Sequence, residues 1–152
     1  EQPQPEQPQP ATDVSVANPL LIPYGAPLQV ADWTFTNPGF MNAINGPIGS
    51  FNPSGRFIVV FVNVANGTGQ DTAIPANFLV IKDAQGRVYD SLPAVSTAYM
   101  NQFGGADQSQ ETPVPADTIT RSVPLIYDVA GDASGLVFFS RAFVDQGWSV
   151  PY

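Results

Sequence analysis

The segment 56–66, RFIVVFVNVAN, constrains the fold more than any other part of this chain, because it is apolar on both sides. Alternate side chains of an extended strand point to opposite faces, so this segment would present two apolar faces. One face would carry Phe57, Val59 and Phe61, and the other Ile58, Val60, Val62 and Val64. The pattern predicts a central strand that is covered on both sides. One cover would be an opposing sheet, and the second an apolar loop, the lead-in segment or another copy of the chain.

Proline and glycine keep the other elements short. The 152 residues include 16 prolines and 13 glycines, spread along the chain, and this favours short strands over long helices. The other expected strands are 28–36, 76–83, 86–90, 118–129 and 135–143. Asp83 and Gly86 suit the first and last positions of a type I turn, and Pro124 indicates a sheet edge or a bulge. We expect a short strand or a single turn over 91–100, and an irregular C-terminus over 145–152.

Two segments near the start of the domain do not follow the pattern of a simple strand or a simple loop. Residues 28–36, LQVADWTFT, change the phase of their alternation, and a β-bulge near Ala31 and Asp32 would let all four large apolar side chains point inward. Residues 37–55 are too rich in glycine, proline and asparagine for regular structure, yet they are unusually apolar. We expect this long loop to pack on the Ile58 face of the central strand or to form a dimer contact.

About seven short strands separated by turn signals predict an all-β fold, an immunoglobulin-like antiparallel β-sandwich. The sandwich would lack a disulfide, because the chain has no cysteine. Residues 1–12 begin with EQPQP written twice, which predicts a Pro/Gln-rich extended spacer. Residues 13–152 would form a single domain. A domain behind such a spacer is typical of a module held away from a surface, so we expect an extracellular or cell-surface location.

Three motifs carry a resemblance to a known family. They are the strand 56–66 ending in Asn66, the strand–turn–strand with Phe78, Asp83, Gly86 and Tyr89, and the late strand LIYDV at 125–129. In these motifs the chain resembles an uncharacterised family of bacterial exported and lipoprotein domains, whose fold is similar to that of a mycobacterial secreted immunogenic protein. The resemblance implies an immunoglobulin-like sandwich on a bacterial surface, with room for a lipid-bearing cysteine upstream of Glu1. It implies no catalytic residues.

Charge and hydropathy narrow the classes of partner. The net charge of −8 disfavours nucleic acid and anionic membrane surfaces, and the five cations form no patch. No run of about 18 apolar residues is present, so no membrane span is predicted. The partners left open are a protein, a cell-wall or other glycan, and a second copy of the chain, that is, a homo-oligomer.

The chain lacks residue types that several kinds of catalytic and metal-binding site require. Without histidine or cysteine it cannot hold a Ser-His-Asp triad, a Cys-His dyad or a histidine zinc site. We predict no enzyme and no cofactor. Calcium is the one metal that stays open, with Asp128 and Asp132 as weak candidate ligands. The alternative is a carboxylate-based hydrolase, or an accessory domain of a surface enzyme, which needs two acids facing across a cleft. For Asp83 a turn role is favoured over a catalytic one.

Large apolar side chains in irregular segments are the candidates for ligand or partner binding. They are Phe40, Met41, Ile44, Phe51, Trp148 and Tyr152. In the competing interpretation, Phe40 and Phe51 plug the outer face of the sandwich and Trp148 covers one of its ends. We therefore expect a non-catalytic extracellular surface module that binds a protein, a glycan or itself, with self-association as the most concrete form.

Overall fold

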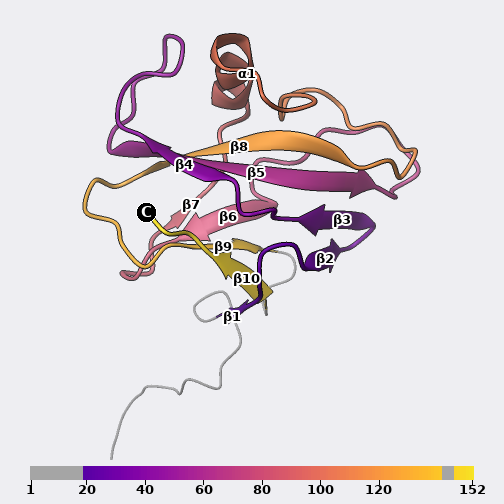
Figure 1. Cartoon of the computed structure of the whole chain (residues 1–152), viewed down its shortest axis with the longest axis horizontal. Coiled ribbons are helices and arrows are strands. Elements are labelled where there is room, and N and C mark those ends of the chain that lie inside the picture. Colours follow the sequence, from indigo (N-terminus) through magenta and orange to yellow (C-terminus); the bar gives the residue numbers. More distant parts are fainter. Residues whose placement is uncertain (1–18, 142–145) are drawn as a thin grey trace, which may run out of the picture.

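The computed structural model describes residues 19–141 and 146–152, and these form two β-sheets packed face to face with one short helix outside them (Figure 1). The first sheet has the order β1 (Leu20–Leu21), β10 (Gln146–Ser149), β9 (Val137–Ser140), β6 (Leu79–Lys82) and β7 (Val88–Tyr89). The second contains β2 (Pro27–Val30), β3 (Trp33–Thr36), β4 (Met41–Ile44), β5 (Arg56–Asn66) and β8 (Arg121–Val129). The helix is α1 (Pro93–Gln102). The predicted all-β sandwich without a disulfide is confirmed, with β1 and β10 forming a parallel pair.

Strand β5 is central, as its two apolar faces predict. It pairs with β8 along one edge, and with β3 and then β4 along the other. Ile58, Val60, Val62 and Val64 are fully buried in the core between the two sheets. The expectation that the apolar loop covers this face is therefore wrong, because the opposing sheet already fills it.

The other face of β5 is covered by α1 and by part of the apolar loop (Figure 1). Phe57 and Val59 are buried there against Ile48 of the loop, Val95 of α1 and Ile126 of β8. The loop thus covers the outer face of β5 rather than the inner one. The helix replaces the short strand or single turn expected for this segment. Its first residue is proline, which suits the start of a helix, but packing on the sheet is what stabilises so short a helix.

Residues 27–36 form a hairpin rather than one bulged strand. Strands β2 and β3 pair antiparallel, with Val30 opposite Trp33 and Leu28 opposite Phe35. Ala31 has φ +53° in the turn between them. Residues directly opposite each other in a hairpin share a face, so all four side chains are buried as expected. The phase change in the sequence marks a chain reversal.

Two segments expected to be irregular are strands. Residues 41–44 continue along the edge of β5 where β3 ends, and residues 146–149 pair with β9. In both cases a long or central neighbouring strand supplies the hydrogen bonds, so local propensity does not decide the outcome. Strand β8 begins at residue 121, later than predicted.

Other expectations agree with the structure. In the β6–β7 hairpin, the Gly86 N–H donates to the Asp83 carbonyl at 3.0 Å, and Gly86 has φ +86°. Pro124 lies in β8, which in the described residues pairs with β5 alone. The predicted spacer over 1–12 lies outside the described residues. Of the helices described, none is long and apolar enough to cross a membrane.

Candidate binding face

The two segments that cover the outer face of the second sheet are uncharged. We use "outer face" for the side of β4, β5 and β8 that carries Phe57, Val59 and α1. Two stretches of sequence without a charged residue, 37–55 and 91–106, meet there, although the chain as a whole has thirteen acidic and five basic residues. The Gly49 N–H donates to the side-chain oxygen of Gln102 at 2.8 Å and links the two stretches.

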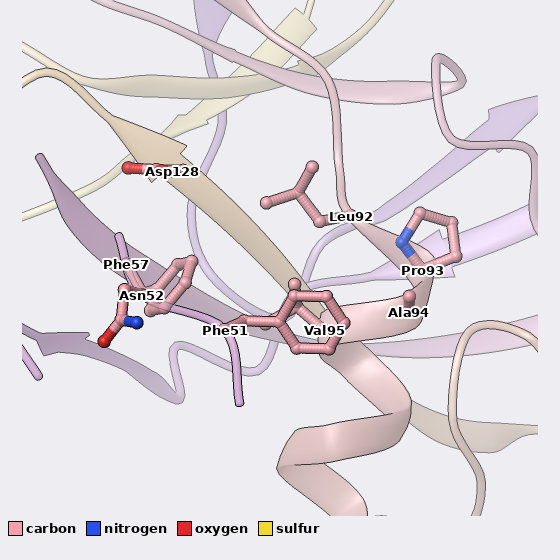
Figure 2. A pocket seen from close by; sticks show the side chains of 8 residues that line it. All are labelled: Phe51, Asn52, Phe57, Leu92, Pro93, Ala94, Val95 and Asp128. Carbon is pink, nitrogen blue, oxygen red and sulfur yellow. The ribbon is translucent and has the colours of Figure 1, made fainter. Parts of the chain in front are cut away.

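A pocket of about 260 Å³ opens in this face beside the start of α1 (Figure 2). Its lining is mostly apolar and comes from the loop, from β5, from β8 and from the start of the helix (Figure 2). The lining residues are Phe51, Asn52, Phe57, Leu92, Pro93, Ala94, Val95 and Asp128. A pocket of this composition can take a small apolar group and hold it away from water.

Hydrogen bonds to β8 fix the helix that forms one wall of the pocket. The Leu92 N–H donates to the Ile126 carbonyl at 2.8 Å, and the Ser96 hydroxyl donates to the Pro124 carbonyl at 2.6 Å. Further along, the Asp107 N–H donates to the Ser122 carbonyl at 3.1 Å. These bonds occupy alternate carbonyls on the edge of β8 that does not pair with β5. The edge is thereby protected from strand pairing with another chain.

A tight turn in the loop places Phe51 at the mouth of the pocket. Ile48 and Phe51 exchange two backbone hydrogen bonds of 2.9 and 3.0 Å across this turn. Ile48 is fully buried under α1, whereas the Phe51 side chain is 39% exposed. One end of the turn is thus anchored in the core while the other presents an aromatic ring to solvent.

Asp128, at the rim of the pocket, holds the end of the loop. Its carboxylate accepts hydrogen bonds from the backbone N–H groups of Ser54 at 2.7 Å and Gly55 at 3.1 Å. Gly55 lies so close to β8 that an added Cβ would stand 2.0 Å from the Val129 carbonyl oxygen. The contacts of Asp128 are therefore structural.

The two weak calcium candidates do not converge on one site. Asp132 accepts a hydrogen bond of 3.0 Å from the Arg87 guanidinium, whereas Asp128 is bound to the loop. Within residues 19–141 and 146–152, no group of three or more acidic, histidine or cysteine side chains could hold a metal ion.

Asp83 is the buried carboxylate of the described residues, and its hydrogen-bond partners explain how a charged group can be buried there. It accepts hydrogen bonds from the Arg87 side chain at 2.6 Å and the Tyr89 hydroxyl at 2.9 Å, and from the backbone N–H groups of Gln85 and Arg87. Burial raises the pKa of Asp83, but these hydrogen bonds outweigh it and leave the pKa below its ordinary value. The role in the turn agrees with the one favoured from the sequence.

The structure separates the predicted binding residues into three places. Phe51 lines the pocket, and Ile44 packs beside Phe57 under the outer face. Phe40 is 69% exposed, while Met41 is half-buried and accepts through its carbonyl a 2.9 Å hydrogen bond from the Tyr152 hydroxyl. Trp148 is different, because it is fully buried.

Burial removes Trp148 from the candidates for binding. Its ring stacks on Phe138 with centroids 5.7 Å apart, inside the core between the sheets. Leu92, Pro93 and Val95, which form one wall of the pocket, were not among the residues predicted from the sequence. The sequence signal that could have indicated this wall is the absence of charged residues over 91–106, together with the Leu-Pro pair near the start of that stretch.

The fold defines the chain as a β-sandwich protein, and comparison with known proteins agrees. No family model matches the chain, and no curated protein does. Among solved structures, the crystal structure of MPT63, a secreted protein from Mycobacterium tuberculosis, is similar, with a TM-score of 0.56 at 15% sequence identity. The similarity covers 88% of this chain and 99% of that chain. At this identity the similarity shows a shared fold.

Proposed function

We propose that this chain is a non-catalytic extracellular module that binds a protein, a glycan or a second copy of itself through its outer face. The observation that carries the proposal is the mostly apolar pocket of about 260 Å³ between two uncharged segments of a strongly acidic chain, with Asp128 as the one charged residue in its lining. Exposed apolar surface that is gathered in one place and hollowed is typical of interaction sites.

A binding role is favoured over catalysis by what surrounds the pocket. A carboxylate-based hydrolase needs two carboxyl groups facing each other across a cleft. The pocket has Asp128 alone on its rim. A second hollow of about 410 Å³ is also lined by Asp128, which is again its single carboxylate. That carboxylate already accepts two backbone hydrogen bonds.

Two observations support an extracellular location. The sequence begins with a repeated Pro/Gln-rich unit of the kind that makes a semi-rigid spacer. The structure with a similar fold belongs to a protein described as secreted. Anchoring to a cell surface is part of the same proposal and would explain the use of a spacer.

Thermal unfolding tests the proposal directly. We would measure the melting temperature at several protein concentrations, and with neutral polysaccharides, acidic polysaccharides and calcium. A partner that binds only the folded chain raises the melting temperature. We expect a rise with protein concentration or with a polysaccharide, and a smaller rise in Phe51→Ala.

The matched control is Ile119→Ala, since Ile119 is also exposed, at 59%, but lies near the Asp117–Arg121 ion pair. The proposal fails if Phe51→Ala and Phe40→Ala, at the two ends of the outer face, both respond like the wild type and like this control. It also fails if the protein hydrolyses any polysaccharide of the panel.

A further inference from the structure

Three aromatic rings are in contact at the far end of the outer face from the pocket, and Phe40 lies beside them on the neighbouring strand segment. We call Phe40, Phe61, Tyr99 and Phe103 the aromatic row. The rings of Phe61 and Tyr99 have centroids 5.9 Å apart, and those of Tyr99 and Phe103 are 4.8 Å apart. Phe40 adjoins Phe61, because the Phe61 N–H donates to the Phe40 carbonyl at 3.0 Å. Met41 faces the core, so alternation directs its neighbour Phe40 outward.

Much of this row is uncovered. Phe40 is 69% exposed and Phe103 is 52% exposed, the highest values among the aromatic side chains of the described residues. Gly105 lies beside the Phe61 ring, because a Cβ added to it would stand 3.9 Å from that ring, an ordinary van der Waals contact. Gly104 and Gly105 have φ of +66° and +88°, a conformation that other residues rarely adopt. The backbone here leaves the ring edge without a covering side chain.

Amide and hydroxyl groups stand beside the rings. Asn42 pairs with Val59 and Asn63 follows Phe61 by two residues, so both lie on the outer face. The Asn42 side-chain oxygen accepts a hydrogen bond from the Ala43 N–H at 2.9 Å, and its NH₂ group has no partner within the described part of the chain. The Asn63 amide has none there either. An amide offers both donors and an acceptor, as the hydroxyls of a sugar do.

The Tyr99 hydroxyl adds a further polar group to this end of the face. Partial burial raises the pKa of Tyr99, so the phenol is protonated at neutral pH and can donate a hydrogen bond. Helix α1, which carries it, has no acidic residue in its first turn and no basic residue in its last. The two asparagine amides and this phenol are neutral, whereas the nearby Asp107 carboxylate accepts a hydrogen bond from the Ser122 N–H at 2.8 Å at the edge of β8.

We propose that the aromatic row binds a neutral glycan, with sugar rings stacked on the exposed phenylalanines and sugar hydroxyls bonded to Asn42 and Asn63. This inference rests on the proposed function, because it names the ligand class of the same outer face. The apolar C–H face of a sugar ring lies flat on an aromatic ring, and neutral amides satisfy the hydroxyls around it. No ionic group is needed on either side.

The lack of charge is what distinguishes a neutral glycan from other ligands. An acidic polysaccharide would be repelled by a chain of net charge −8. Contacts between proteins are enriched in arginine together with aromatic residues, and neither 37–55 nor 91–106 contains arginine. Aromatic rings among uncharged amides match the chemistry of a neutral sugar chain.

Native affinity electrophoresis tests the inference. The protein would be run in gels that contain mannan, galactomannan, laminarin, arabinogalactan or hydroxyethylcellulose, with alginate as an acidic polymer and a plain gel as reference. We expect at least one neutral polymer to retard the wild type. Phe40→Ala and Phe103→Ala should each weaken that retardation roughly two- to tenfold, the equivalent of one aromatic contact.

Controls separate loss of the site from loss of the fold. Both phenylalanines are exposed, so their alanine variants should melt like the wild type, and Ile119→Ala should be retarded like the wild type. The inference is overturned if no neutral polymer retards the protein, if alginate alone does, or if the two variants are retarded as strongly as the wild type.

Sedimentation of the same variants distinguishes this inference from the broader proposal. If the wild type forms dimers that Phe40→Ala or Phe103→Ala dissociates, a second copy covers the row, and the glycan inference falls while the proposed function stands. If the wild type sediments as a monomer and no ligand raises its melting temperature, both fall.

Discussion

The two faces of β5 are equally apolar in sequence but are covered in different ways. On the inner face, Ile58 and Val60 are fully buried between two paired sheets. On the outer face, Phe57 and Val59 are buried as well, but their cover is a ten-residue helix and a loop. A sheet covers a whole face because its strands pair side by side, whereas one helix covers only a stripe. The pocket and the aromatic row lie at the two ends of that stripe.

The largest expected effect is the loss of an inner-face side chain. Ile58→Ala leaves a cavity between two sheets that cannot close around it, so we expect the free energy of unfolding to fall by about 4 kcal/mol. Urea unfolding with an unchanged slope would check this.

Ile48→Ala is the matched variant on the outer face, where a loop can move into the space. We expect a loss of about 2 kcal/mol there. Equal losses for the two isoleucines would mean that the two covers are equally rigid. The difference drawn here between the two faces of β5 would then be wrong.

Asp83 lies away from both faces of β5, in the turn between β6 and β7 at the edge of the first sheet. Its effect on the stability of the fold depends on pH. Its pKa in the folded chain is lowered, so the unfolded chain binds more protons and the carboxylate stabilises the fold above about pH 4. That stability is lost as the pH falls through the folded pKa. We expect Asp83→Asn to be less stable than the wild type at neutral pH.

The pH profile is the readout that tests this charge. Melting temperatures of Asp83→Asn should fall less steeply than those of the wild type as the pH is lowered from neutral. Parallel profiles for the two proteins would show that the carboxylate charge contributes nothing.

Ser96 tests how firmly the helix is held to the sheet. Its hydroxyl donates to the Pro124 carbonyl at 2.6 Å and accepts from the Gln110 N–H at 2.9 Å, all in buried surroundings. Ser96→Ala leaves both groups without a partner, and we expect a loss of about 2 kcal/mol. Hydrogen exchange should show faster opening of α1 than of β5.

Thr97→Ala is the control for that substitution. Thr97 is the next residue of the helix, and its hydroxyl bonds to Ser109 at 3.0 Å nearer the surface. It should cost clearly less than Ser96→Ala. A loss as large as that of Ser96→Ala would show that the segment around Ser109 holds the helix as firmly as β8 does.

The smallest effect on stability is expected at the pocket. Phe51 is 39% exposed, and the backbone bonds of its turn do not need its ring. Phe51→Ala should change the free energy of unfolding by less than about 1 kcal/mol while weakening the response to a partner. A large loss of stability would place Phe51 in the core and remove it from the binding face.

Much of the fold could be predicted because it depends on local or strongly periodic signals. The central position of β5 follows from its doubly apolar alternation, and the β6–β7 turn follows from Asp83 and Gly86. The candidate site could be predicted only in part. Phe40 and Phe51 stand out as apolar residues in a loop, but nothing local shows that Trp148 is in the core.

Two of the strands and the helix could not be predicted from the local sequence. Residues 41–44 and 146–149 become strands because a neighbouring strand supplies hydrogen bonds, which no property of those short segments reveals. The helix over 93–102 has no side-chain cap at its start, and it is stabilised by bonds to β8 and by burial of Val95.

The sequence by itself determined that this chain forms a β-sandwich around one doubly apolar strand, without disulfide or histidine chemistry. Alternation, turn residues and missing residue types are local properties, so they can be read along the chain. Only the tertiary structure decided which face of β5 the loop covers and that a pocket and an aromatic row remain beside the helix. Those features depend on which distant segments compete for the same apolar surface, and that competition is settled by packing.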